Sequence, residues 1–427
     1  MSARRLLVVT YYYPPQPGSG SNRWAAMVKY LRRLGHQVTV VTAAAPGHPP
    51  SESDGVVRTA SLNANPVLRR LLLRGEGTAR QGSASGQGGD QGGVMPPLLW
   101  KGIVPDPWLL TWDPAAWTAI RRALSRGPLD CLITSSPAES THLLGLAFAR
   151  RAGAWIADFR DGWCFEPLRP ALPTAVQRRL DERMERRVAR RADAVVGVTA
   201  PIVDDFQTRL GVAAHLVSNG FDPDLGGDEA QSGPAEERRL SFVHTGALSG
   251  PRGRDPLPLL RALRKLVDDA PELRGRLELI VAGRSEEDEL ELVRTAGAGD
   301  IVRHLGYRPR SEALALQRAA GTLVLITSRD RCEATGKLYE YMAAGRPIIA
   351  LAEGNEAARI VAETNTGVLV SPDDSEEIAG ALRAAVSGEL ERAYAPRGRE
   401  RYAYPGLAEQ MASVVETAIE RRASRAR

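Results

Sequence analysis

The residues best placed to do chemistry lie in one short segment near the C-terminal end of the chain. Thr335-Gly336-Lys337 opens an expected helix, Glu340 follows one turn later, and Gly345-Arg346-Pro347 ends it. Phosphate oxygens accept hydrogen bonds from the N–H groups at a helix start and are favoured by its dipole. Glu340 shares a face with Lys337 and could accept from two ribose hydroxyls. The segment predicts a nucleotide site, and the alternative is an ordinary capped helix with a Lys–Glu ion pair.

Bulk composition predicts a soluble protein with more than one domain. The chain has 427 residues, of which 43% are hydrophobic and 25% charged, and a domain averages about 150 residues. No run approaches the roughly 18 consecutive apolar residues of a membrane-spanning helix, so we expect a cytoplasmic protein. Three widely spaced cysteines without a metal-binding pattern predict free thiols and no structural metal. A net charge of +5 argues against a dedicated nucleic-acid binder, so no nucleic-acid partner is expected.

One expected helix is strongly basic. Arg178 to Arg191 reads RRLDERMERRVARR, which contains seven arginines against three acids. Leu180, Met184 and Val188 are spaced four apart, so the helix has a narrow apolar stripe. Two interpretations remain open: a solvated outer helix of an α/β domain, or a peripheral contact with the anionic inner face of a membrane.

The first 220 residues follow the alternating pattern of an α/β domain. An apolar run at 6–10, a helical pattern at 24–34 and a β-branched run at 38–41 predict one βαβ unit. Further strands are expected at 132–134, 155–157, 194–198 and 214–217, with a helix at 138–151. Residues 1–220 are therefore predicted to form one doubly wound, Rossmann-like domain.

A second alternating series occupies residues 239–400. Its expected strands lie at 240–244, 277–281, 301–304, 323–326, 348–351 and 367–370, and its expected helices include 256–269 and 374–386. Residues 221–238, rich in Gly, Asp, Glu and Pro, are predicted to be a linker. Residues 401–427 are expected to form a helix that packs back on the first domain. The predicted fold class is α/β, with two Rossmann-like domains facing a central cleft at the carboxyl ends of their strands.

A polar insertion interrupts the first domain. Residues 74–95 are rich in Gly, Gln and Ser, cannot supply a packed core and are predicted to be mobile. Four tryptophans follow, namely Trp100, Trp108, Trp112 and Trp117. They would either bind a hydrophobic or sugar acceptor or anchor the loop by packing.

Six short motifs occur along the chain in a fixed order. They are Pro14-Pro15 followed by Gly18-Ser19-Gly20, Gly35-His36-Gln37-Val38, Ser218-Asn219-Gly220-Phe221-Asp222, Val281-Ala282-Gly283-Arg284, Gly306-Tyr307, and the segment from Lys337 to Pro347. In this order, and over nearly the whole chain, they resemble the GT-B glycosyltransferases of family 4. The resemblance implies a hexosyltransferase-type enzyme that moves a sugar from a nucleoside diphosphate sugar to an acceptor hydroxyl, with retention at the anomeric carbon.

The resemblance also implies partners. The acceptor would be a small molecule, a glycan or a lipid-linked compound of specialised-metabolite or cell-surface glycan biosynthesis. The family requires no metal and no cofactor beyond the sugar nucleotide. Because the family uses no metal, arginine, lysine and helix N-termini would have to neutralise the leaving diphosphate.

The resemblance places several residues at the donor. In this family a basic residue opens the helix after the first strand of the second domain, and Arg254, with Arg252 as the alternative, has that place here. Lys337 would share the cationic role, because Ala247 stands where many members carry an arginine. The other residues expected at the donor are Gly18, Ser19, Gly20, Asn219, Gly246, Gly283, Arg284, Thr335 and Gly336.

Carboxylates complete the expected site. Glu340 resembles the second glutamate of the family's paired motif, which holds the ribose. Cys332 occupies the position of the first glutamate, so the neighbouring Glu333 is the candidate for its catalytic role. In the first domain, Arg160 and Asp161 follow a strand and would orient the acceptor or stabilise an oxocarbenium-like charge. The alternative for those two residues is a structural ion pair.

Other functions fit parts of the pattern. A nucleotide-sugar 2-epimerase shares the two-domain plan without transferring a sugar, and the altered first glutamate leaves room for a non-catalytic sugar-nucleotide-binding protein. A dinucleotide oxidoreductase is disfavoured. The segment from Gly18 to Arg23 lacks the third glycine of that fingerprint, and the second strand ends without an acidic ribose ligand.

Overall fold

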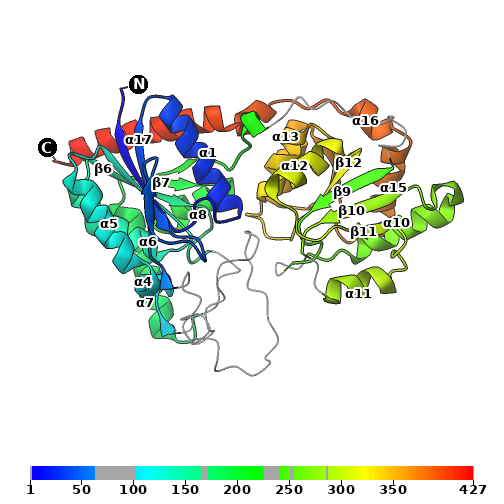
Figure 1. Ribbon diagram of the computed structural model, residues 1–427, viewed down its shortest axis with the longest axis horizontal. Helices are drawn as coiled ribbons and strands as arrows, with labels where there is room; N and C mark the ends of the chain where they lie inside the picture. Colours follow the sequence, from blue (N-terminus) through cyan, green and yellow to red (C-terminus); the bar gives the residue numbers. More distant parts are fainter. Residues whose placement is uncertain are drawn as a thin grey trace. The chain divides into compact units, whose positions relative to one another are not determined.

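Short β-branched runs form strands in both halves of the chain, and they assemble into two separate sheets (Figure 1). The computed structural model describes residues 2–62, 102–165, 172–225, 240–250, 254–284 and 287–426. One unit consists of Met1–Ser218 together with Tyr404–Arg427, and the other of Asn219–Ala403. The insertion predicted at 74–95, Arg252 and the linker from residue 226 to 238 lie outside the described residues.

The first unit is built on an eight-stranded sheet in the order β3-β4-β2-β1-β5-β6-β7-β8. All neighbouring strands are parallel except β3 and β4, which pair antiparallel. The strands are β1 (Arg5–Thr10), β2 (Gln37–Ala43), β3 (Ser51–Ser53), β4 (Val56–Thr59), β5 (Cys131–Ser135), β6 (Ala154–Phe159), β7 (Ala194–Gly197) and β8 (Ala214–Leu216). The apolar runs β1, β5 and β6 are buried along their length, as central parallel strands must be.

Helices pack against this sheet. They are α1 (Ser19–Arg33), α4 (Trp108–Thr111), α5 (Asp113–Ser125), α6 (Ser140–Phe148) continued by the 3₁₀ turn η2 (Ala149–Arg151), α7 (Ala175–Arg191), α8 (Ala200–Leu210) and α17 (Tyr404–Ala426). The last helix of the chain, α17, lies beside α1 and contributes Leu407, Met411 and Val415 to the same core as Trp24 (Figure 1). The first unit is therefore built from both ends of the chain.

The second unit has a six-stranded parallel sheet in the order β11-β10-β9-β12-β13-β14. Its strands are β9 (Ser241–Thr245), β10 (Glu278–Ala282), β11 (Val302–His304), β12 (Thr322–Ile326), β13 (Ile348–Leu351) and β14 (Gly367–Val370). Its helices are α10 (Leu257–Asp269), α11 (Glu287–Thr295), α12 (Arg310–Ala319), α13 (Gly336–Ala344), α14 (Glu356–Thr364), α15 (Ser375–Val386) and α16 (Glu389–Ala393), with 3₁₀ turns η3 (Pro223–Leu225), η4 (Pro271–Leu273) and η5 (Arg399–Tyr402).

The second sheet has apolar clusters on both of its faces. In the second unit, one cluster lies with α10 and α15 and includes Leu263 and Leu382, and another lies with α13 and includes Tyr341 and Met342. The predicted α/β class with two Rossmann-like domains is confirmed. No helix among the described residues combines the length and apolar content that crossing a membrane requires.

Candidate functional site

The helix start singled out from the sequence is the N-terminus of α13. Thr335 is its N-cap residue and has extended backbone, yet its side chain makes no capping hydrogen bond. The hydroxyl of Thr335 is buried and has no hydrogen-bond partner among the described residues. The first turn of a helix also leaves backbone N–H groups without intrahelical acceptors, at the positive end of its dipole. The start of α13 therefore offers several unused donors to an anion.

Lys337 extends from this first turn to the loop that follows β9. A Cβ added to Gly246 would overlap the Lys337 ammonium, so the two are in direct contact. Burial, and then the nearby charge of Arg254, lower the pKa of Lys337 to about 7. Glu333 and Glu340 are close enough to act in the opposite direction. A ligand that brings negative charge here would raise this pKa and restore the full charge of the ammonium.

Arg254 reaches the same place from the segment before α10. Its backbone bridges to Gly250, and its guanidinium lies where a Gly250 side chain would be. Gly283, directly after β10, packs on the backbone of Gly246 so closely that a Cβ at residue 283 would overlap it. The Gly246 N–H donates to the carbonyl of the last β10 residue over 2.7 Å. Glycines thus let these strand-end loops meet and bring two cations together.

Two carboxylates belong to this region: Glu333 lies between β12 and α13, and Glu340 lies within α13. Glu333 is 1% exposed, and its Oε2 accepts from both the N–H, over 2.7 Å, and the hydroxyl of Ser328. Its other oxygen, Oε1, is buried and has no hydrogen-bond partner within the described ranges. Glu340 accepts from Arg310 Nε at 3.2 Å and from Gln317 Nε2 at 3.4 Å. Glu340 also lines a shallow surface pocket together with Phe221, Leu225, Arg310, Leu314 and Gln317.

In the first unit, Arg160 lies at the carboxyl end of β6 and meets the turn after β1. Its guanidinium donates to the Ser19 hydroxyl over 3.3 Å. A Cβ on Gly20 would overlap the same guanidinium, so arginine and turn are in contact. Gly18, with a φ of 118°, provides the left-handed backbone before α1. Asp161 is partly exposed and forms no ion pair with Arg160, so the ion pair considered for these two residues is not present.

The ion pair of this region joins two other residues. Arg23 and Asp158 are both fully buried and lie 3.0 Å apart. Asp158 also accepts from Ser135, and Arg23 donates to the carbonyl of Ser218 over 2.6 Å. The pair ties α1 to the ends of β5 and β6. Sequence reasoning missed it because the partners are 135 positions apart and no local pattern links them.

A second group that sequence reasoning missed is Asp113, in the first turn of α5. Both of its carboxylate oxygens are buried, and neither has a hydrogen-bond partner in the described part of the chain. Burial, and then the charge of Asp106, raise the pKa of Asp113 to about 8. In the sequence Asp113 resembles an ordinary acidic residue at a helix start, so the sequence does not indicate that it is buried.

The structure brings most of the predicted donor residues of the second unit together. Lys337, Arg254, Gly246 and Gly283 meet as described above, with Thr335, Gly336, Glu333 and Glu340 on the adjoining segment. Arg284 is exposed and has no hydrogen bond or ion pair with a described residue. Asn219 is buried at the first position of the second unit. Arg310 and Gln317 were not predicted, because only the fold places α12 beside α13.

Comparison with protein families gives matches in both units. Residues 18–220 match the model described as glycosyl transferase 4-like domain. Residues 241–387 match the model described as glycosyl transferases group 1. The two matches follow each other along the chain and coincide with its two sheets.

Individual proteins show the same likeness. A phosphatidyl-myo-inositol mannosyltransferase of Mycolicibacterium smegmatis is 28% identical over 340 residues, which cover 76% of this chain and 80% of that protein. A D-inositol 3-phosphate glycosyltransferase of a Nocardioides species is 34% identical over 151 residues, or 32% of each chain. The sucrose-phosphate synthase structure from Thermosynechococcus elongatus has a TM-score of 0.65 at 18% identity, covering 97% of this chain and 98% of that one.

Proposed function

Since the chain belongs to the family 4-like glycosyltransferases of GT-B fold, we propose that it transfers a sugar from a nucleoside diphosphate sugar to an acceptor hydroxyl, with retention at the anomeric carbon. The observation that carries the proposal is the convergence at the start of α13. There Lys337, Arg254 and the unbonded hydroxyl of Thr335 surround backbone that favours anions.

In this proposal the second unit holds the donor. Lys337 and Arg254 neutralise the diphosphate as it leaves, and the Thr335 hydroxyl donates to a phosphate oxygen. Glu340 accepts from the ribose hydroxyls. Glu333, whose Oε1 has no partner in the part of the chain that the structure describes, accepts from a hydroxyl of the donor sugar. The leaving phosphate takes the proton of the attacking acceptor hydroxyl on the same face of the sugar, so retention needs no separate side-chain base.

The acceptor is proposed to be a hydroxyl compound, and a lipid-linked one at the inner membrane face is favoured. The mannosyltransferase relative acts, by its name, on a phosphatidyl-myo-inositol, which is a membrane lipid. Arg160, held by Ser19 and Gly20 at the carboxyl end of β6, would orient that acceptor, with Asp161 beside it. No metal and no cofactor other than the sugar nucleotide is required by this scheme.

A two-step experiment tests the proposal. First, UDP, GDP and dTDP are screened for a rise in melting temperature, because a ligand that binds only the folded state stabilises it. The sugar nucleotides of the best base are then incubated with and without a panel of polyol and lipid-linked acceptors. Release of nucleoside diphosphate only with acceptor, and a product with retained anomeric configuration by NMR, are expected.

Matched variants locate the site. Glu340→Gln should abolish most of the thermal shift and turnover, whereas Glu312→Gln, on the exposed side of α12, should leave both unchanged. Conversion of the sugar nucleotide without acceptor would identify an epimerase instead. Absence of any nucleotide-induced shift would refute the proposed donor site.

A further inference from the structure

Helix α7 buries two of its three acidic side chains and exposes all of its arginines. Asp181 and Glu185, one turn apart, are 4% and 0% exposed. Every arginine of the helix is exposed, namely Arg178, Arg179, Arg183, Arg186, Arg187, Arg190 and Arg191. Glu182 is the helix's one exposed acid. The net positive charge of α7 is therefore concentrated on its outer side.

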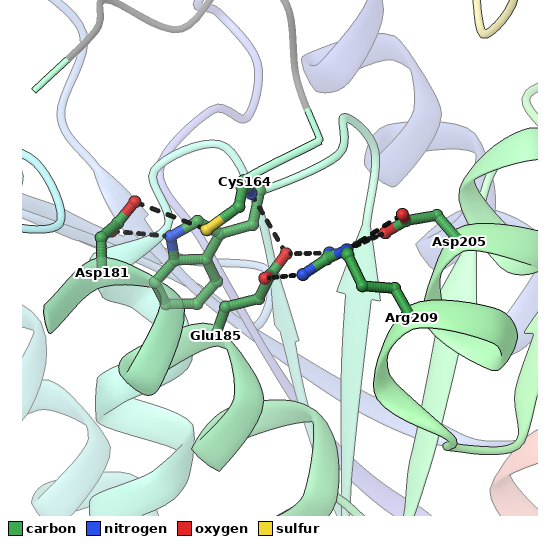
Figure 2. Close-up of polar contacts among 6 residues, drawn as sticks. Cys164, Asp181, Glu185, Asp205 and Arg209 are labelled. Atoms are coloured by element: carbon green, nitrogen blue, oxygen red, sulfur yellow. Dashed lines mark hydrogen bonds and ion pairs between the residues drawn. The ribbon is translucent and has the colours of Figure 1, made fainter. Parts of the chain in front are cut away.

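Bonds inside the first unit hold the two buried acids (Figure 2). Asp181 accepts from the Trp163 indole at 2.9 Å and from the Cys164 thiol at 3.6 Å. Glu185 accepts from the Cys164 N–H at 3.1 Å and from both terminal nitrogens of Arg209 at 2.6 and 2.8 Å. Because these carboxylates point inward and are fully occupied, they do not pair with the arginines on the outer side.

The outer arginines form a continuous stripe. Arg179, Arg183, Arg186 and Arg190 follow each other at spacings of four and three, which places them on one face of the helix. None of these four has a hydrogen bond or ion pair with a described residue. Two apolar side chains share this side, Val176 with 73% and Leu180 with 42% exposure. We call this surface, from Val176 to Arg190, the arginine face.

We propose that the arginine face docks on an anionic phospholipid surface. Arginine pairs with phosphate groups through its planar fork of donors, and exposed apolar residues on a basic helix insert at the headgroup boundary. Basic residues next to a membrane strengthen its binding electrostatically and additively. A nucleic acid would also attract the arginines, but a nucleic-acid partner would not explain why the apolar side chains of Val176 and Leu180 are exposed.

The bonds behind the arginine face connect it to the acceptor side of the first unit. Trp163 and Cys164 belong to the segment that leaves β6 directly after Arg160 and Asp161. Their hydrogen bonds to α7 fix that segment to the back of the arginine face. A membrane under α7 would therefore contact the helix that fixes Trp163 and Cys164, three and four residues after Arg160. This connection, which rests on the proposed function, favours an acceptor drawn from the lipid surface.

Vesicle sedimentation of the full chain tests the surface directly. We expect strong binding to phosphatidylglycerol–phosphatidylcholine vesicles at low salt, little to pure phosphatidylcholine, and a steep loss of binding with added salt. Replacing Arg179, Arg183 and Arg186 by Gln should weaken partitioning about 100-fold, at roughly fivefold per basic residue. A control that replaces the exposed Arg261, Arg276 and Arg383 of the second unit by Gln makes the same charge change and should bind within about twofold of wild type.

The outcomes are distinct. Equal loss in both triple variants, salt-insensitive binding, or tighter binding to an RNA or DNA oligonucleotide than to anionic vesicles would overturn the proposal. Transfer to a water-soluble acceptor should be unchanged in the α7 variant, while transfer to a vesicle-bound acceptor falls. Because vesicle binding is measured without turnover, it tests the membrane-docking proposal independently of the proposed glycosyl transfer.

Discussion

Nucleotide affinity should fall as the pH rises above neutrality, because Lys337 has to be charged to hold a diphosphate. Burial and the charge of Arg254 lower its pKa to about 7 in the free protein. A bound diphosphate favours the charged form and raises that pKa. Above pH 7 the free protein must therefore take up a proton when it binds, and the dissociation constant increases up to about tenfold per pH unit.

The magnitude follows from the fraction of charged Lys337. With a pKa of about 7, that fraction falls from about one quarter at pH 7.5 to about one hundredth at pH 9. The dissociation constant should therefore rise about 25-fold over this interval. Both pH values lie well above the second phosphate pKa of roughly 6, so the charge of the ligand stays constant.

Calorimetric titration with the best-binding nucleoside diphosphate measures both the affinity and the proton uptake, the latter by comparing buffers of different ionisation enthalpy. Lys337→Arg keeps its charge at every pH and should give a flat profile with tight binding. Lys337→Met should give a flat profile with weak binding. A flat wild-type profile, or a Met variant that retains the wild-type slope, would refute the assignment of Lys337 to the diphosphate.

Three other changes test separate contacts. Arg310→Ala should lower the calorimetrically measured affinity for a ribonucleoside diphosphate several-fold, because Arg310 acts through Glu340. The affinity for the 2′,3′-dideoxy analogue should not change. Equal losses for both ligands would contradict this. Gly20→Ala should lower kcat at least about tenfold with little change in nucleotide affinity, since its methyl group displaces Arg160; unchanged turnover would exclude that role. The pKa of Asp113 is about 8 in the folded protein and 3.8 ordinarily, so the folded state becomes less stable as the pH rises between these values. Calorimetric melting should therefore show that Asp113→Asn stabilises the protein more at pH 8 than at pH 5. An equal or inverted effect would contradict this.

Most of the fold could be predicted because its signals are local. Apolar runs such as 38–41 and 348–351 became β2 and β13 with boundaries shifted by no more than a residue or two. The hairpin β3–β4 was missed. All three β3 residues are exposed serine or glutamate, so this edge strand buries no side chain that would give it an apolar pattern.

The candidate site likewise contains residues that could be predicted from local sequence and residues that could not. The start of α13 was predictable, because the residues that cap a helix and those that face an anion lie within one turn of each other. The partners of Glu340 were not, since Arg310 and Gln317 come from a helix that only the fold brings near. Asp158 was similarly passed over in favour of its neighbours Arg160 and Asp161. Its partner Arg23 lies on α1, and burial of that pair is a tertiary property. The chemical roles of Arg254, Glu333 and Arg160 remain predictions for the experiments above.

The return of α17 to the first unit sets an order of events during synthesis. The ribosome makes residues 1–218 first, yet the core that contains Trp24 also needs Leu407, Met411 and Val415. The second unit has all of its strands and core residues in one continuous stretch. It can therefore complete its folding while the first unit still exposes the apolar groove that α17 will fill. During that interval the unfinished groove is the surface on which a chaperone would act, and the arrival of α17 is the step that covers it.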